Sequence, residues 1–300
     1  MTAKLPTYET LEIALREGVA SIWMNRPQLR NAFNETMIAE LTAAFQALGE
    51  VPEVRAVVLA GRGTAFCAGA DLNWMKKMAG FSFEENQRDA MGLAGMLRTI
   101  YTLSKPTLAR VHGPTFAGGM GLVSACDIAV ASQEAEFCLS EVKLGLIPAT
   151  ISPYVLAAMG ERAAPRYFLT AERFSAAEAY RIGLVHELAP AAELDYRINA
   201  ILGQLVTAGP ASIAATKELI RAVGRRPLDP NLIENTATRI AQARASDEGK
   251  EGVRSFLEKR KPSWHPDVKT PAAGGTGAGG KQANGPQAAG DAAAKSRRAP

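Results

Sequence analysis

The chain has 300 residues, of which 47% are hydrophobic and 21% are charged, and its formal net charge at pH 7 is +4. These proportions are typical of globular proteins, so they exclude a wholly disordered, collagen-like or coiled-coil chain, and the length fits one large α/β domain with appendages. No stretch reaches the roughly 18 apolar residues of a membrane-spanning helix. Residues 1–13 carry Lys4, Pro6 and Glu9 where a secretory signal needs an unbroken apolar run, so we expect a cytoplasmic protein with no membrane partner.

The basic residues are concentrated at the end of the chain. Residues 261–300 contain six basic and two acidic side chains, an excess that equals the net charge of the whole protein. The chain before residue 261 is therefore neutral overall and offers no basic face of the kind that binds nucleic acid. Residues 263–300 are rich in Gly, Ala and Pro, so we predict that they form a disordered basic tail.

The first part of the chain alternates predicted strands and helices. β-Branched and aromatic residues over 18–24 predict a strand that ends at a turn before Pro27. Asn34 is then placed to cap a helix whose apolar residues recur at helical spacing as far as Gly49. A nearly continuous apolar run over 54–60 predicts a strand that is buried on both faces, as in a parallel sheet.

The alternation continues through the middle of the chain. Ser82 and Glu85 have the spacing of a capping box at the start of a helix, and a strand over 107–111 follows that helix. A further strand is predicted over 128–131, which completes the pattern of an α/β core. Beyond Pro148 the pattern is helical, and prolines separate three further helical stretches.

The cysteines indicate a reducing compartment. Cys67, Cys126 and Cys138 are odd in number and have no metal-type spacing. They therefore favour neither a disulfide framework nor a zinc site, and we predict no metal.

Two glycine-rich turns, over 66–72 and 113–121, each follow a predicted strand and precede a predicted helix. Neither contains the Gly-Lys-Ser/Thr triplet of a phosphate loop or the Gly-x-Gly-x-x-Gly of a dinucleotide site. Exposed backbone N–H groups in such turns are what an enzyme directs at a developing oxyanion, and the positive end of a following helix favours an anionic oxygen. Glycines also serve tight turns and close helix–sheet packing, so the pattern alone leaves both interpretations open.

One carboxylate, that of Glu141, lies in the largely apolar stretch 137–148. Poor hydration raises the pKa of a carboxyl group toward neutrality, where the group can accept and return protons. The alternative is a solvated glutamate that pairs with Lys143.

These segments, taken in order, resemble the crotonase family, which is the enoyl-CoA hydratase/isomerase group. The matching motifs are Asn25-Arg26-Pro27, Asn31-Ala32-Phe33, Ala68-Gly69-Ala70-Asp71-Leu72, Gly118-Gly119, Cys126-Asp127-Ile128, Ser140-Glu141 and Leu146-Ile147-Pro148. The resemblance extends over about residues 8–262. It implies an α/β fold built as a spiral of repeated ββα units over 1–200, followed by a C-terminal helical trimerisation region over 201–262.

The resemblance also implies the site and its partners. The thioester carbonyl of an acyl-CoA is implied to lie between the N–H groups of Ala70 and Gly118, an oxyanion hole, with Glu141 as the catalytic acid and base. The residues implied to hold CoA are Arg26, Ala68, Gly69, Ala70, Asp71 and Leu72, with Phe256 and Lys259 near its nucleotide end. Lys259 is implied to serve a neighbouring subunit of a homotrimer or a dimer of trimers. Coenzyme A belongs to the substrate, so no separate cofactor is implied.

One position, Gly121, departs from the family pattern, because hydratases of the family usually have a second glutamate there. A single carboxylate can still take a proton from water and return one to the α-carbon. Isomerisation is the alternative, because Δ3,Δ2-enoyl-CoA isomerases also work with one base.

The segments around Gly121 and Glu141 resemble bacterial methylglutaconyl-CoA hydratases of leucine breakdown and their relatives in isoprenoid breakdown. That resemblance favours hydration of a branched glutaconyl-CoA. The distal carboxylate of such a substrate needs a cation or a hydroxyl group. The candidates, which the sequence does not rank, are Lys76, Lys77, Arg98, Thr150 and Tyr154.

Overall fold

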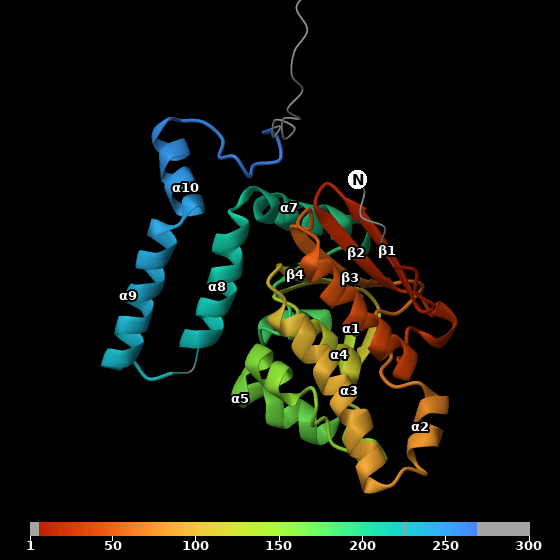
Figure 1. Ribbon diagram of the computed structural model, residues 1–300. Helices are drawn as coiled ribbons and strands as arrows, with labels where there is room; N and C mark the ends of the chain where they lie inside the picture. Colours follow the sequence, from red (N-terminus) through yellow and green to blue (C-terminus); the bar gives the residue numbers. More distant parts are fainter. Residues whose placement is uncertain (1–5, 225, 269–300) are drawn as a thin grey trace, which may run out of the picture. The chain divides into compact units, whose positions relative to one another are not determined.

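A six-stranded sheet forms the centre of the computed structural model, which describes residues 6–224 and 226–268 (Figure 1). Its strands are β1 (Leu11–Arg16), β2 (Val19–Met24), β3 (Ala56–Gly61), β4 (Thr107–Val111), β6 (Ile128–Ser132) and β9 (Glu187–Ala189), in that order across the sheet. β1 is antiparallel to β2, and every other neighbouring pair is parallel. Parallel neighbours need long crossover connections, which the helices between the strands supply.

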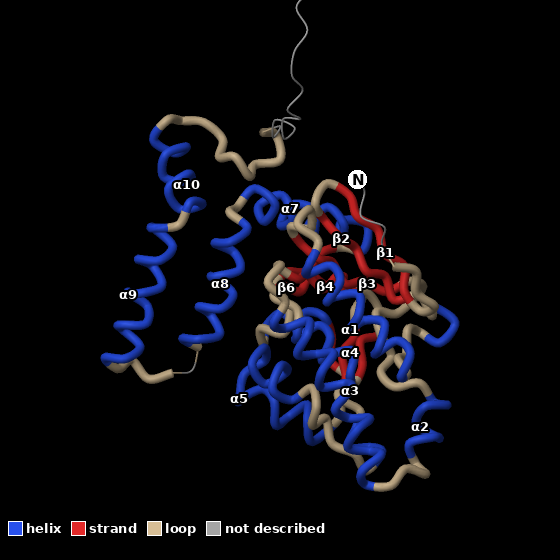
Figure 2. The backbone as a smooth tube through the Cα atoms, viewed as in Figure 1, coloured by secondary structure: helices blue, strands red, loops and turns tan. Residues whose placement is uncertain are grey.

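Helices cover both faces of this sheet (Figure 2). They are α1 (Glu35–Glu50), α3 (Phe83–Thr102) and α4 (Gly118–Ala125) on one face, and α7 (Leu194–Thr207) on the other. β3 is buried along its whole length, with Val57 and Leu59 in the larger core and Ala56 and Val58 in the smaller core beneath α7. Successive side chains of a strand point to opposite faces, so a strand covered on both sides is apolar throughout.

A second sheet of three short strands leads into the candidate site. It consists of β5 (Pro114–Phe116), β7 (Glu136–Cys138) and β8 (Phe174–Ser175), followed by α5 (Ser152–Thr170) and α6 (Ala176–Arg181). β5 and β7 are parallel, so their carboxyl ends meet at one edge.

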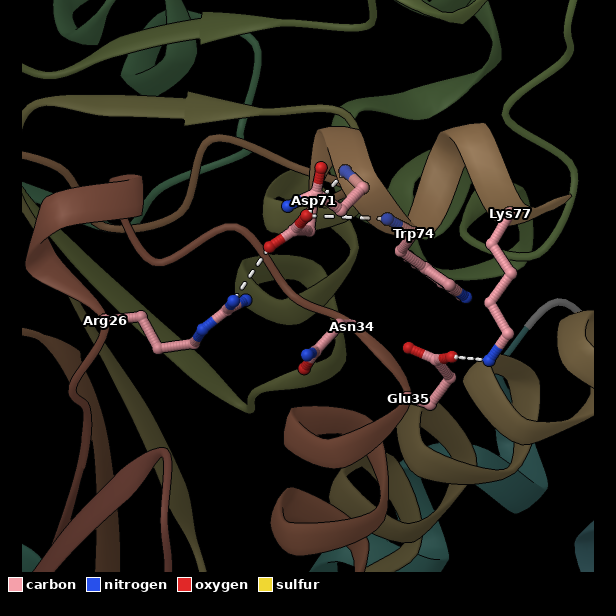
Figure 3. A pocket seen from close by; sticks show the side chains of 7 residues that line it. Arg26, Asn34, Glu35, Asp71, Trp74 and Lys77 are labelled. Carbon is pink, nitrogen blue, oxygen red and sulfur yellow. Dashed lines mark hydrogen bonds and ion pairs between the residues drawn. The ribbon is translucent and has the colours of Figure 1, made fainter. Parts of the chain in front are cut away.

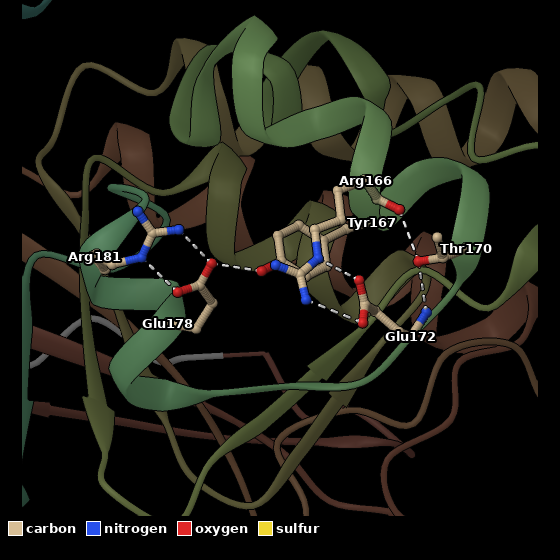
Figure 4. A network of polar contacts seen from close by, with 6 residues as sticks. All are labelled: Arg166, Tyr167, Thr170, Glu172, Glu178 and Arg181. Carbon is tan, nitrogen blue, oxygen red and sulfur yellow. Dashed lines mark hydrogen bonds and ion pairs between the residues drawn. The ribbon is translucent and has the colours of Figure 1, made fainter.

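Figure 4 shows the polar network between α5 and α6, in which hydrogen bonds from Arg181 and Tyr167 hold the pKa of Glu178 at about 2.

Three helices follow α7 in the described chain. They are α8 (Pro210–Val223), α9 (Pro230–Ala245) and α10 (Asp247–Leu257). α8 is anchored by Lys217, which is 8% exposed, pairs with Asp127 at 2.5 Å and donates to the carbonyl of Lys105. Asp127 also accepts hydrogen bonds from the N–H and the hydroxyl of Thr107 at the start of β4. An ion pair between buried Lys217 and half-buried Asp127 therefore ties α8 to the sheet.

The predicted α/β fold is confirmed, and most predicted elements lie within a few residues of the observed ones. β4 coincides with the predicted strand 107–111, and Asn34 caps α1 by accepting a hydrogen bond from the N–H of Met37. β1 is not predicted from the sequence. It pairs with β2 through a tight turn at Glu17, and at the sheet edge its pattern mixes apolar and charged residues.

The proposed division of the chain at residues 200 and 262 stays a prediction. The first boundary falls inside α7, whose apolar side chains belong to the core beneath the sheet. Residues 263–268 are described, and the Trp264 indole N–H donates to the carbonyl of Thr207 at 3.1 Å. The remainder of the predicted tail, residues 269–300, lies outside the described residues.

Within the described ranges, no single helix combines the length and the apolar composition needed to cross a membrane. Residues 191–207 and 210–223 meet those criteria only as a pair, which is bent by 107°.

Candidate active site

The two glycine-rich turns lie side by side. Cys67 forms an isolated parallel bridge with Thr115, and the N–H of Phe116 donates to the carbonyl of Cys67 at 2.9 Å. Gly69 reaches the second turn directly, since a Cβ there would lie 3.1 Å from the Cβ of Ala117. Gly69 also has φ +94°, a conformation that favours glycine. The structure therefore brings together the two segments that the sequence singled out separately.

In the first turn, the backbone around Ala70 is paired with Phe33. The N–H of Phe33 donates to the carbonyl of Gly69 at 2.9 Å, and the N–H of Asp71 donates to the carbonyl of Phe33 at 3.0 Å. Successive N–H groups of an extended segment point in opposite directions. The N–H of Ala70 therefore points away from Phe33, and within the described chain it donates to no acceptor.

In the second turn, Gly118 is the first residue of α4, and the first N–H groups of a helix have no acceptor within the helix. Ala117 precedes it with φ 48° and ψ −122°, a strained combination for a residue with a Cβ. The N–H of Ala117 donates to the carbonyl of Cys138 at 2.8 Å, which fixes this turn against β7. A Cβ at Gly118 would lie 2.2 Å from Cζ of Phe33, so the packing requires glycine there. Strain held by its surroundings is common at functional sites.

Glu141 follows β7 at the same edge. It begins a 3₁₀ helix over Glu141–Leu144, three residues after Cys138, whose carbonyl holds Ala117. Its Oε2 atom is buried and has no hydrogen-bond partner within the described chain. Burial raises the pKa of Glu141 above the usual value for a glutamate, and a hydrogen bond from its own backbone N–H only partly offsets this effect. The alternative of a solvated pair with Lys143 is not formed in the described chain, and the acid is suited to carry a proton.

Arg26 and Asp71 form an ion pair at one side of the first turn (Figure 3). The Arg26 guanidinium donates to Asp71 at 2.8 Å and to the carbonyl of Ala32 at 2.6 Å. Asp71 caps α2 (Leu72–Met78) through the N–H groups of Asn73 and Trp74. Burial acts to raise the pKa of Asp71, but these hydrogen bonds outweigh it and hold the pKa below its ordinary value. Asp71 therefore caps α2 and ties it to Arg26, and its implied role in holding CoA stays a prediction.

A cavity of about 220 Å³ lies beside this ion pair (Figure 3). Its lining residues are Arg26, Asn34, Glu35, Asp71, Asn73, Trp74 and Lys77. Lys77 pairs with Glu35 on α1, so two ion pairs border the cavity. Ala68 joins the turn through its N–H, which donates to the carbonyl of Arg30 at 3.0 Å, and the Leu72 side chain is exposed.

Phe256 and Lys259 are not brought to this cavity. Phe256 is on α10 and is 81% exposed, and Lys259 follows the end of α10 with φ 55°. Figure 1 shows α10 far from α2 within the described chain. Phe256 and Lys259 are therefore not among the residues that line this cavity in one subunit.

Sequence reasoning did not anticipate the surroundings of Gly121. A Cβ on Gly121 would lie 2.3 Å from Cγ2 of Ile151 and 3.6 Å from Cδ2 of Leu97. Ile151 therefore occupies the space that a side chain at position 121 would need. The signal in the sequence is weak, because Ile151 is thirty residues away and its contact depends on how α4 and α5 pack.

The chain is similar to known proteins over nearly all of its described length. The family described as enoyl-CoA hydratase/isomerase matches residues 14–267. The structure of an enoyl-CoA hydratase from Shewanella pealeana is 42% identical with a TM-score of 0.84, covering 85% of this chain and 96% of that one. AtuE of Pseudomonas aeruginosa is 38% identical with a TM-score of 0.82, covering 85% and 99%. A crotonyl-CoA hydratase of Syntrophomonas wolfei is 30% identical, covering 85% of this chain and 97% of its own.

Proposed function

The chain belongs to the enoyl-CoA hydratase/isomerase family, and from that premise we propose that it adds water across the 2,3 double bond of an enoyl-CoA. In this proposal the N–H groups of Ala70 and Gly118 bind the thioester oxygen. Each such donor is worth on the order of 3 kcal/mol when negative charge develops on the oxygen it binds. Coenzyme A is part of the substrate, and the reaction requires no other cofactor.

Glu141 moves the protons. Its carboxylate takes a proton from water, and the resulting hydroxide bonds to the β-carbon. The electron pair of the double bond shifts to give an enolate, whose oxygen the two N–H groups stabilise. Protonated Glu141 then returns a proton to the α-carbon, so the elements of one water are added and the acid is regenerated. A carboxyl group whose pKa is raised by burial releases and accepts a proton more readily near neutral pH than an ordinary glutamate.

The observation that carries this proposal is the buried Oε2 of Glu141, which has no partner within residues 6–224 and 226–268. It lies at the edge where two backbone N–H groups also have no acceptor in those ranges. Buried polar atoms are usually hydrogen-bonded, and unsatisfied ones often mark a functional site. A water molecule and a thioester oxygen would satisfy all three groups.

We further propose that the substrate is a branched glutaconyl-CoA such as 3-methylglutaconyl-CoA, formed in leucine or isoprenoid breakdown. Support comes from the resemblance of the segments around Gly121 and Glu141 to methylglutaconyl-CoA hydratases. Δ3,Δ2-Enoyl-CoA isomerisation is the second candidate. Ile151 favours it specifically, because it leaves no room for a second acid at position 121.

The CoA nucleotide is proposed to lie against a neighbouring subunit. α10, which carries Phe256, lies away from α2 at the cavity, as a site shared across a homotrimer or a dimer of trimers requires (Figure 1). Three free, buried cysteines agree with the proposed cytoplasmic location.

The test is a panel of acyl-CoA thioesters read by absorbance and by mass. Hydration removes the ultraviolet absorbance of the conjugated 2-enoyl thioester and adds the mass of one water. Isomerisation makes that absorbance appear from a 3-enoyl thioester with no change in mass. Glu141→Gln is the control, because it keeps the shape of the side chain and removes the titratable proton. If no member of the panel were hydrated, the proposal would be refuted.

A further inference from the structure

Three helices meet beside Gly121, one turn after the start of α4. Leu97 of α3 and Ile151 at the start of α5 both contact the space where a Cβ of Gly121 would lie. Both side chains are buried. They form an apolar wall next to the helix that begins with the N–H of Gly118, where the proposed thioester oxygen binds.

A polar and aromatic cluster continues outward from this wall. Arg98 follows Leu97 on α3, and Tyr154 lies one turn beyond Ile151 on α5. Tyr101, one turn after Arg98, packs edge-on against Tyr154 with ring centroids 5.3 Å apart and an interplanar angle of 67°. Residues three apart on a helix share a face, so Arg98 and Tyr101 both face the start of α5.

The charged and hydroxyl ends of this cluster are free to bind a ligand, as far as the contacts of the described residues go. Within the described residues, neither the guanidinium of Arg98 nor the hydroxyl of Tyr154 has a hydrogen bond or an ion pair. Tyr154 is partly buried, and burial raises the pKa of its hydroxyl, with Tyr101 acting in the same direction and the charge of Arg98 opposing it. The hydroxyl therefore stays protonated at neutral pH and can donate a hydrogen bond beside an unpaired cation.

The other candidates for binding a distal carboxylate lack the combination of an unpaired cation and a neighbouring hydroxyl group. Lys77 is paired with Glu35. Lys76 on α2 is exposed, as Arg98 is, but unlike Arg98 it has no hydroxyl partner among the contacts of the described chain. Thr150 precedes Ile151 but brings no charge.

We propose that Arg98 and Tyr154 form a carboxylate subsite that selects acyl-CoA substrates with an acidic group at the far end of the acyl chain. This inference rests on the proposed function, because it assumes that the thioester oxygen lies at Gly118. A guanidinium presents several N–H donors in a plane that matches a carboxylate, and a neighbouring hydroxyl supplies a further donor. The wall formed by Leu97 and Ile151 would contact the apolar part of the acyl group.

The test measures binding of two thioesters that cannot be hydrated, glutaryl-CoA and pentanoyl-CoA. They differ by a carboxylate in place of a terminal methyl group. We expect the wild-type protein to bind glutaryl-CoA more tightly. Arg98→Gln is expected to weaken glutaryl-CoA binding about 10- to 100-fold, as for loss of hydrogen bonds to a charged group. Binding of pentanoyl-CoA by this variant should change by less than about 3-fold.

Three further variants make the measurement specific. Tyr154→Phe should weaken glutaryl-CoA binding alone, and Arg98→Lys should restore part of the lost affinity. Arg88→Gln makes the same substitution at an exposed position of the same helix and should leave both affinities unchanged. Far-ultraviolet circular dichroism of each variant checks that the fold is retained.

The outcomes separate this inference from the proposed function. A wild-type protein without preference for glutaryl-CoA, or a preference that survives in Arg98→Gln, would overturn the subsite. An equal loss of both affinities in Arg98→Gln would also overturn it, because a purely structural effect does not distinguish the two ligands. The hydration assay is independent of these measurements, so a protein that binds glutaryl-CoA through Arg98 but hydrates no thioester would refute the proposed function alone.

Discussion

Replacement of Gly121 by alanine tests whether Ile151 leaves room for any side chain at position 121. The new Cβ would lie 2.3 Å from Cγ2 and 2.9 Å from Cβ of Ile151. Ile151 is 2% exposed and branched at Cβ, so it has little freedom to rotate away. We expect overpacking to cost about 3 kcal/mol. Alanine's better helix propensity returns about 1 kcal/mol. The free energy of unfolding should therefore fall by about 2 kcal/mol.

The double variant Gly121→Ala/Ile151→Ala gives the sharper measurement. Ile151→Ala alone should cost about 3 kcal/mol, because it removes buried methyl groups and leaves a cavity. In the double variant the 2.3 Å clash with Cγ2 is gone, and only the 2.9 Å approach to the remaining Cβ of residue 151 has to be relieved by a small shift. The new methyl group then fills part of that cavity and retains the gain in helix propensity. We expect a total loss of about 2 kcal/mol, against about 5 kcal/mol if the two changes were additive.

The assay is urea unfolding followed by circular dichroism at one fixed protein concentration. Gly95→Ala is the matched control, since it also places alanine within a helix but nothing lies within 4 Å of the new Cβ. The free energy of unfolding of this control should rise by up to about 1 kcal/mol. If Gly121→Ala were as stable as Gly95→Ala, or if the two changes at 121 and 151 were additive, the reasoning would be refuted.

Three other regions give direct predictions. Glu141→Gln should lower the hydration rate by at least about 100-fold with CoA binding retained. In the wild-type protein kcat/KM should fall as pH drops through the raised pKa of Glu141, because the carboxylate is the form that accepts a proton. A pH profile that falls only near the pKa of an ordinary glutamate would contradict this. Lys217→Met leaves Asp127 without its buried partner and should destabilise the protein by about 3 kcal/mol in thermal or urea unfolding, whereas Lys250→Met, at an exposed site, should change stability by less than about 0.5 kcal/mol. Burial raises the pKa of the Cys67 thiol to about 12, so alkylation at pH 8, followed by mass spectrometry, should be slow in the folded protein and fast after unfolding.

The elements that sequence predicted well are those fixed by local chemistry. The Asn34 cap depends on a side chain and an N–H three residues apart, and the capping box of Ser82 and Glu85 depends on the same spacing. The apolar run of β3 reports burial on both faces directly. β1 gives no such signal, because an edge strand exposed to solvent can mix charged and apolar residues and is fixed mainly by pairing with its neighbour.

The candidate site was predictable only in part for the same reason. Glycine clusters and a lone acid in an apolar stretch pointed to segments that the structure brings to one edge. That the segments meet depends on β5 and β7 being parallel and on the bridge between Cys67 and Thr115. These contacts join residues far apart in sequence, and no local pattern specifies them. The strain at Ala117 is equally invisible, because alanine has no preference for its observed φ of 48°.

In the proposed site, backbone N–H groups bind the oxygen and a side chain moves the protons, and this limits how the chemistry can vary. Backbone N–H groups belong to every residue, so a side-chain substitution at Ala70 or Gly118 does not delete the proposed oxyanion donor, although it can displace it. The packing of Gly118 against Phe33 keeps that donor in place. The chemistry therefore changes through the side chains that face the donors, and here one of those positions is closed by Ile151. If a second acid were required for hydration, this chain would have to isomerise double bonds instead. Hydration by this protein would mean that one acid suffices when two donors hold the oxygen.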